Sequence, residues 1–208
     1  MSGFFISLEG VEGVGKSTNL TFIADWLKQQ AVDFILTREP GGTELAEAIR
    51  TLLLTPREEA MAVDTELLLV FAARAQHVAE KIRPALARGQ TVISDRFVDA
   101  TYAYQGFGRG LPLATIESLH QLILKNFLPH LTIYLDLDVE TGLARARQRG
   151  ELDRFERETA AFFERVRAGY LARVQQDPKR FAVIDASLPL EQVQANIAQV
   201  LANYFKRS

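Results

Sequence analysis

The sequence contains no cysteine, which excludes a disulfide framework and thiolate metal sites. It has no apolar run near the roughly 20 residues that span a bilayer, and no basic segment leading into the apolar stretch of a secretory signal. Its 24 Lys and Arg residues nearly balance 26 Asp and Glu residues, giving a net charge of −2. That balance gives no electrostatic case for binding nucleic acid or an anionic membrane. We therefore expect a soluble, cytoplasmic protein with neither kind of partner.

Short apolar runs alternate with longer helical patterns along the chain. The length of 208 residues suits one domain, residues 1–208, better than two. The apolar runs predict strands at residues 4–9, 33–38, 91–95, 131–137 and 181–185, and a longer pattern predicts a helix over 64–88. Strands that alternate with helices indicate an α/β fold. We expect a three-layer sandwich, in which a parallel five-stranded sheet carries helices on both faces.

A glycine-rich loop, "GVEGVGKST", follows the first predicted strand. It completes the pattern G-x-x-x-x-G-K-[S/T], in which backbone N–H groups surround phosphate oxygens and the next helix turns its positive end toward them. Lys16 is placed to reach the β- and γ-phosphates, and the Ser17 hydroxyl to ligate Mg²⁺. The loop predicts a P-loop domain that binds a nucleoside triphosphate with magnesium through Gly10, Val11, Glu12, Gly13, Val14, Gly15, Lys16, Ser17 and Thr18, but it does not identify the reaction.

A second candidate for anion binding follows the strand "TVISD". Asp95 ends this strand and therefore lies at the carboxyl edge of the sheet, where open α/β sheets bind their ligands. Asp95 is predicted to hold the magnesium shell or a group of the acceptor, and Arg96 to clamp a phosphate. A GTPase switch is disfavoured, because the chain lacks the N-K-x-D that reads guanine and the D-x-x-G of a second switch. A small kinase remains.

Residues 145–158, "RARQRGELDRFERE", are dense in charge and are called the lid segment below. They contain Arg145, Arg147, Arg149 and Arg154, whereas the variable positions of the phosphate loop contain no arginine. Phosphoryl transfer is accelerated by arginines that neutralise charge in the transition state. We expect the lid segment to supply that arginine, with Arg145 and Arg149 as the contacts to ATP.

The segments "EGVEGVGKST", "REPGGTELAEAIR", "FAARAQH", "SDRFVDATYAYQGFGRG" and "RARQRGELDRFE" occur in the order and spacing of thymidylate kinases, which the chain resembles over nearly its whole length. The arginines of the lid segment resemble the bacterial form of that family. The resemblance implies a P-loop fold like that of nucleoside monophosphate kinases. It also implies Mg²⁺-dependent transfer of phosphate from ATP to dTMP, giving dTDP, and a homodimer formed through helices around residues 64–88.

The resemblance also implies roles for individual residues. Phe71 would stack on thymine while Arg74 hydrogen-bonds its O4, and Tyr104 would crowd the 2′ position of the sugar. The acceptor dTMP would be bound by Glu39, Pro40, Arg50, Phe71, Arg74, Arg96, Thr101, Tyr104 and Gln105. ATP would be bound by the phosphate loop, Arg145, Arg149 and, near adenine, Ala186. The catalytic residues would be Glu12, Lys16, Asp95, Arg96 and Arg149, with Glu12, Ser17 and Asp95 as metal ligands.

Two alternatives stay open on the residues alone. The chain is either a kinase for another nucleoside or nucleoside monophosphate, or a nucleotide-binding module with this fold that has no turnover. The three histidines, His77, His120 and His130, show no spacing typical of a metal site, so structural roles are expected for them and for Trp26.

The lid segment generates the first testable prediction. Arg149→Ala should lower kcat by on the order of 100-fold or more with little change in dTMP binding, because the contact forms mainly in the transition state. Arg149→Lys should restore only part of the loss, since a point charge lacks the planar fork of guanidinium. Turnover and calorimetry measure this. If kcat collapses in Arg147→Ala or Arg154→Ala instead, the choice of arginine is wrong.

Overall fold

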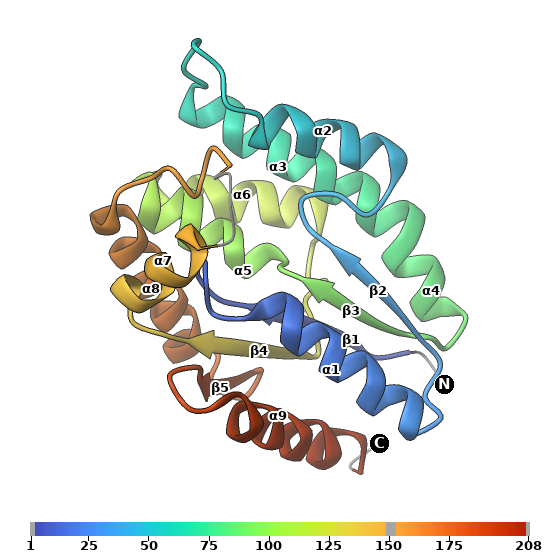
Figure 1. Ribbon diagram of the computed structural model, residues 1–208. Coiled ribbons are helices and arrows are strands. Elements are labelled where there is room, and N and C mark those ends of the chain that lie inside the picture. Colours follow the sequence, from blue (N-terminus) through green and yellow to red (C-terminus); the bar gives the residue numbers. More distant parts are fainter. Residues whose placement is uncertain (1–2, 149–152, 207–208) are drawn as a thin grey trace.

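The computed structural model describes residues 3–148 and 153–206, and within them a five-stranded parallel sheet in the order β2-β3-β1-β4-β5 (Figure 1). The expected α/β fold and its five strands are confirmed, with ends that differ from the predicted ones by one residue at most. The strands are β1 (Phe5–Glu9), β2 (Phe34–Arg38), β3 (Thr91–Asp95), β4 (Leu131–Asp136) and β5 (Phe181–Asp185).

Helices cover both faces of the sheet because each central strand is apolar on both sides. Ile6 and Leu8 of β1 pack with Ile23 of α1 and Ile197 of α9, whereas Phe5 packs with Ile82 in a second cluster. The α-helices are α1 (Lys16–Gln29), α2 (Glu44–Leu54), α3 (Val63–His77), α4 (Arg83–Ala87), α5 (Val98–Thr101), α6 (Leu113–Ile123), α7 (Val139–Arg147), α8 (Ala160–Gln176) and α9 (Leu190–Phe205). Two π-helical segments are η1 (Val78–Ile82) and η2 (Tyr102–Gly108).

The helix predicted over residues 64–88 is divided in the structure. Helix α3 ends at His77, the π-helical η1 follows, and α4 begins at Arg83. Pro84 lies in the first turn of α4. Because proline has no N–H and its ring clashes with the carbonyl four residues earlier, the regular α-helical ladder cannot continue through it. Gly89, with φ of 82°, follows the end of α4.

The order and direction of the strands determine where the site lies. All five strands are parallel, so their carboxyl ends lie along one edge. Strand β1 lies between β3 and β4, and the chain crosses from one side of β1 to the other after β3. Ligands of open α/β sheets bind at the carboxyl ends of strands where the strand order reverses in this way. The phosphate loop after β1 and the Asp95–Arg96 pair after β3 therefore lie at the same crevice.

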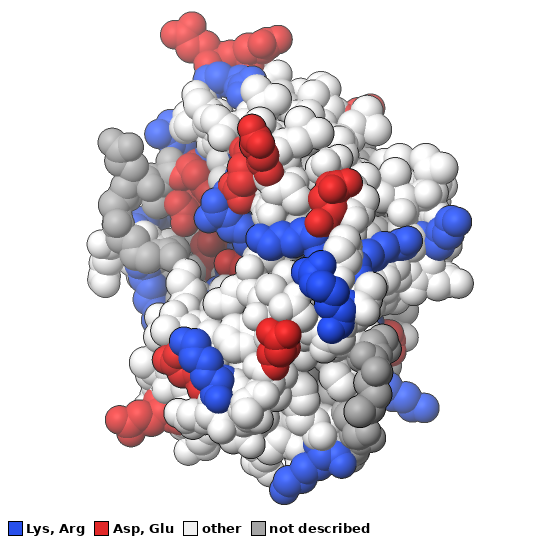
Figure 2. Space-filling view, turned by 90° about the vertical axis from the view of Figure 1, so that its right-hand side faces the viewer, with Lys and Arg blue, Asp and Glu red and all other residues white. Residues whose placement is uncertain are grey.

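On the face that Figure 2 shows, acidic and basic side chains of the described residues are interspersed. Among the residues that the structure describes, no helix combines the length and the apolar character needed to cross a membrane.

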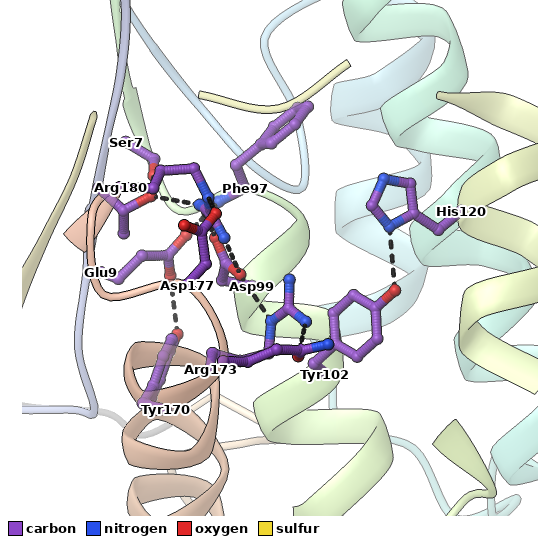
Figure 3. Close-up of polar contacts among 12 residues, drawn as sticks. Ser7, Glu9, Phe97, Asp99, Tyr102, His120, Tyr170, Arg173, Asp177 and Arg180 are labelled. Carbon is purple, nitrogen blue, oxygen red and sulfur yellow. Dashed lines mark hydrogen bonds and ion pairs between the residues drawn. The ribbon is translucent and has the colours of Figure 1, made fainter. Parts of the chain in front are cut away.

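A buried ion cluster joins helices α5 and α8 to the loop before β5 (Figure 3). The Asp99 carboxylate is fully buried, and it accepts hydrogen bonds from Arg180 at 2.7 and 3.0 Å and from Nε of Arg173 at 2.9 Å. Arg180 also donates to the Thr132 hydroxyl of β4 at 2.8 Å. Burial acts to raise the pKa of Asp99, but the hydrogen bonds and charge of Arg180 outweigh it, so the pKa lies below its ordinary value.

This cluster generates the second prediction. Asp99→Asn should lower the free energy of unfolding by about 3–5 kcal/mol, because two buried guanidinium groups lose their counter-charge. Denaturant unfolding at pH 7 measures it. Asp25→Asn is the matched control, since Asp25 forms an exposed pair with Lys28 whose loss should leave stability nearly unchanged. Equal effects of the two substitutions would contradict the assignment.

Candidate active site

A single cleft of about 470 Å³ collects most of the predicted site residues at the carboxyl edge of the sheet. The predicted residues in its wall are Glu12, Gly13, Val14, Gly15, Lys16, Ser17, Thr18, Glu39, Pro40, Arg50, Arg74, Asp95, Arg96, Thr101, Tyr104, Gln105 and Arg145. Gly10 and Val11 lie buried at the base of the phosphate loop. Arg149 lies outside the described residues.

The phosphate loop needs its glycines for close packing. Gly13 has φ of 75°, and a Cβ atom there would lie 1.9 Å from the carbonyl oxygen of Gly142 in α7. The loop therefore adopts its turn only with glycine at this position. The loop ends at Gly15, the N-cap of α1, which has no side chain to cap the first turn. The N–H groups of that turn, left without a side-chain cap, suit an anion as their acceptor.

Lys16 lies across the loop that precedes it. Its Nζ donates to the carbonyl oxygens of Gly10 and Val11 at 3.1 and 3.0 Å and lies 3.9 Å from Glu12. Burial, followed by the positive charge of Arg96, lowers the pKa of Lys16. A cation in this position is poorly solvated, and a phosphate bound in the cleft would stabilise its charge further.

The donor set of the cleft fits a magnesium ion bound together with phosphates. The Oδ1 atom of Asp95 is buried and has no hydrogen-bond partner among the described residues. The Ser17 hydroxyl is exposed to the same cleft. Within the described ranges, His, Asp and Glu do not gather in threes as a complete metal cage would require. That arrangement suits Mg²⁺, which keeps several waters and phosphate oxygens in its shell.

Arg96 lies between the phosphate loop and the acceptor side of the cleft. Its guanidinium donates to Glu12 Oε1 at 2.5 Å, to the Gly10 carbonyl at 2.8 Å and to the Tyr170 hydroxyl at 3.1 Å. The guanidinium carbon also lies 4.8 Å from the ring centroid of Tyr104. Arg96 and Glu12 thus form an ion pair at the centre of the cleft, where both were predicted to act.

The opposite end of the cleft is organised by Arg74, whose side chain is 2% exposed. Its Nε donates to Glu39 at 2.6 Å, Nη1 to the Thr101 hydroxyl at 2.8 Å and Nη2 to the Phe97 carbonyl at 3.2 Å. The other oxygen of Glu39 lies 3.0 Å from Nδ1 of His77. These contacts hold the guanidinium in one orientation. It still has N–H groups beyond those three bonds for the carbonyl of a base.

Helix α2, which follows the loop after β2, places Arg50 in the cleft. Arg50 donates to the Pro40 carbonyl at 2.8 Å, and burial together with the charge of Arg38 lowers its pKa. The Arg38–Glu47 pair, at 2.8 and 3.2 Å, closes this loop, and Glu47 also accepts the N–H of Gly42 at 2.8 Å. The loop and α2 therefore bring a partly desolvated cation to the acceptor side.

A thymidylate kinase family model matches residues 8–197. The thymidylate kinase of Pseudomonas entomophila is 59% identical over 207 residues, covering 100% of this chain and 99% of that protein. This chain belongs to the thymidylate kinase family. The thymidylate kinase of Teredinibacter turnerae is also 59% identical, over 201 residues that cover 97% of this chain and 98% of that protein. The predicted class of enzyme, an ATP-using kinase, is confirmed.

A solved structure supports the same fold. The crystal structure of thymidylate kinase from Ehrlichia chaffeensis has a TM-score of 0.77 and 32% sequence identity, and the match covers 97% of this chain and 99% of that one. The resemblance to thymidylate kinases seen in the motifs therefore extends to the arrangement of the strands and helices.

Phe71 and Ala186, two of the predicted site residues, do not line the cleft. Phe71 is buried, and the guanidinium of Arg74 lies 5.2 Å from its ring centroid. Its stacking on thymine stays a prediction, since the ring packs below Arg74 with Phe97 and Leu67. Ala186 contributes its carbonyl, which accepts from Arg145 at 3.4 Å.

Sequence reasoning missed Glu66, a carboxylate with a side chain that is 1% exposed. It accepts from Gln105 at 2.9 Å and forms ion pairs with Arg109 at 3.2 Å and Arg154 at 2.6 Å. Arg154 therefore faces neither solvent nor the phosphate loop, and it also donates to the Leu53 carbonyl at 2.6 Å. The sequence did contain a signal for this role, because Glu66 is an acidic residue in an otherwise apolar helical segment just before "FAARAQH". Its partners, however, are 39 or more residues away in sequence.

Proposed function

We propose how the residues of this cleft carry out the phosphorylation of dTMP to dTDP by ATP, the activity that membership of the thymidylate kinase family assigns to the chain. The observation that carries the proposal is one cleft with the phosphate loop at one end and the buried Arg74 cluster at the other. We propose that residues 1–208 act as one domain, with residues 145–158 as its lid.

At the donor end, the phosphate loop binds the β- and γ-phosphates of ATP. Lys16 supplies positive charge, and the first turn of α1 supplies N–H groups. Mg²⁺ bound with ATP would neutralise charge on the β- and γ-phosphates, and its proposed ligands are Ser17, Asp95 and Glu12. Arg145, which donates to the Ala186 carbonyl, lies where the nucleotide would enter.

At the acceptor end, Arg50 and Arg96 bind the 5′-phosphate of dTMP. Arg74 donates to the thymine carbonyl while Glu39 and Thr101 hold its guanidinium in place. Gln105 contacts the edge of the base, and Glu66 holds its amide group. Tyr104, whose hydroxyl donates to Glu12 at 3.2 Å, limits the space around the 2′ carbon of the sugar.

In the reaction, an oxygen of the 5′-phosphate attacks the γ-phosphorus of ATP. The bond from the γ-phosphorus to the oxygen that bridges to the β-phosphate breaks, and ADP leaves. The residues act by positioning the two phosphates and neutralising their charge, without a covalent intermediate on the protein. Lys16 acts on the donor and Arg96 on the acceptor.

The third prediction tests the acceptor end by ADP release against a panel of nucleoside monophosphates. The wild type should turn over dTMP fastest. Arg74→Ala should raise KM for dTMP with KM for ATP nearly unchanged, because an unpaired base carbonyl costs about 1–3 kcal/mol. Arg165→Ala, which removes a guanidinium that donates to the Gly108 carbonyl outside the cleft, is the control. No ADP release with dTMP would refute the function, and equal losses for both substrates would refute the role of Arg74.

A homodimer is the second proposal, and exposed leucines on two neighbouring helices support it. Leu45 and Leu52 of α2 are 56% and 48% exposed, and Leu68 of α3 is 57% exposed. Helices α2 and α3 pack side by side at the top of Figure 1. Leu45 and Leu52 are seven residues apart and so share one helix face. A second copy of the chain could cover this face through a two-fold interface.

The fourth prediction follows from that face. Sedimentation at micromolar concentration should show a dimer of the 23.3 kDa chain, and Leu68→Glu should shift it to the monomer because a charge would be buried against the partner. Leu190→Glu, on an exposed leucine of α9, should leave the dimer intact. A wild type that sediments only as a monomer would contradict the proposal.

A further inference from the structure

Glu9, the last residue of β1, is a fully buried carboxylate that the proposed reaction does not use. Both oxygens have partners: Oε1 accepts from the backbone N–H of Phe97 at 2.7 Å, and Oε2 accepts from the Tyr170 hydroxyl at 2.8 Å (Figure 3). Glu9 does not line the cleft. It lies directly below the phosphate loop, within reach of the chain segment that carries Arg96.

The backbone of Arg96 requires support. Its φ is 66°, in the left-handed region that residues with a Cβ atom rarely adopt. The peptide groups on both sides are held by the end of β1: the N–H of Arg96 donates to the Leu8 carbonyl at 3.0 Å, and that of Phe97 donates to Glu9. The Glu9 carboxylate thus replaces a ladder hydrogen bond where the strand pairing ends.

The side chain of Arg96 is oriented through the same carboxylate. The Tyr170 hydroxyl donates its one proton to Glu9, so an oxygen lone pair remains for Nη1 of Arg96, which lies 3.1 Å away. Tyr170 belongs to α8 and stacks on Tyr134 of β4, with ring centroids 5.1 Å apart. Tyr170 is therefore held in place by its stacking on Tyr134, and it links the position of the Glu9 carboxylate to that of the Arg96 guanidinium.

Burying an ionised carboxylate at this position costs free energy. Burial, followed by the negative charge of Asp99, raises the pKa of Glu9 to about 8, so the group is predominantly a carboxylate only above that pH. A buried glutamine would satisfy the N–H of Phe97 equally well, but its amide NH₂ cannot accept the proton of Tyr170. A neutral side chain of the same size would therefore lose the hydrogen bond from Tyr170 and, through it, the support of Arg96.

We propose that Glu9 is a positioning residue, which holds Arg96 through Phe97 and Tyr170 so that its guanidinium grips the 5′-phosphate of the acceptor. This inference rests on the proposed function, which assigns that phosphate to Arg96. Glu9 itself touches neither substrate.

The test compares binding of dTMP, thymidine and ATP by calorimetry at a pH about one unit above the pKa of Glu9, where the wild type carries the carboxylate, because thymidine lacks only the phosphate. In Glu9→Gln and in Tyr170→Phe, the preference for dTMP over thymidine should fall by about tenfold, as for one weakened charge-assisted contact. The affinities for thymidine and ATP should stay within about twofold. Tyr134→Phe removes the hydroxyl of the stacked neighbouring tyrosine, which donates to Asp136, and should leave the preference unchanged.

A double substitution shows whether the effect passes through Arg96. Arg96→Ala should abolish most of the preference for dTMP, and adding Glu9→Gln to it should change the preference no further. If Glu9→Gln does not fold, Tyr170→Phe decides alone. An unchanged preference in a folded variant, or equal losses for dTMP, thymidine and ATP, would overturn the role of Glu9. A wild type that binds thymidine as tightly as dTMP and releases no ADP would instead refute the proposed function, and the role of Glu9 with it.

Discussion

The guanidinium of Arg96 makes the contacts that join the two halves of the cleft, and the arrangement of the site depends on them. It connects the phosphate loop, through Gly10 and Glu12, to the acceptor side, where Tyr104 lies against it. Its left-handed backbone follows from the sharp exit of the chain from β3. Burial, followed by the positive charge of Arg96, lowers the pKa of Lys16, so both cations are stabilised when anions bind on the two sides. The site is therefore built to bring two phosphates together.

Buried ion pairs beneath the cleft keep this arrangement rigid. Asp99 holds α8 through Arg173, and Glu9 holds it through Tyr170, one helical turn earlier. Helix α8 follows directly after the lid segment, with Thr159 as its N-cap. At the other side of the cleft, Glu66 connects α3 to Arg154 of the lid segment. The contacts on both sides of the cleft thus involve two neighbouring parts of the chain, the lid segment and α8. Buried carboxylates of this kind specify geometry more than they add stability.

The sequence predicted the fold closely because its signals are local. Each strand is a short apolar run, and the nine consecutive residues of the phosphate-loop motif begin directly after the first strand and end in the first turn of the first helix. Gly10, Lys16 and Ser17 could be assigned from spacing alone. The π-helical segments were missed, since the residue pattern of η2 does not differ from that of an α-helix.

The contacts between the supporting residues could not be predicted for a different reason. Glu9 and Tyr170 are 161 residues apart, and Glu39 and Arg74 are 35 apart. A single sequence carries no signal for pairs at such separations, because only the fold brings them together. His77 illustrates the limit: its spacing indicated no metal site, yet its ring holds Glu39 at the edge of the cleft.

A crystal structure with dTMP and a non-hydrolysable ATP analogue tests the central claim most directly, because it locates both phosphates relative to Arg96. The account predicts that the 5′-phosphate of dTMP lies within hydrogen-bonding distance of the Arg96 guanidinium. The γ-phosphate of the analogue should face it from the loop around Lys16. A dTMP phosphate bound elsewhere, with Arg96 still paired to Glu12, would contradict the account.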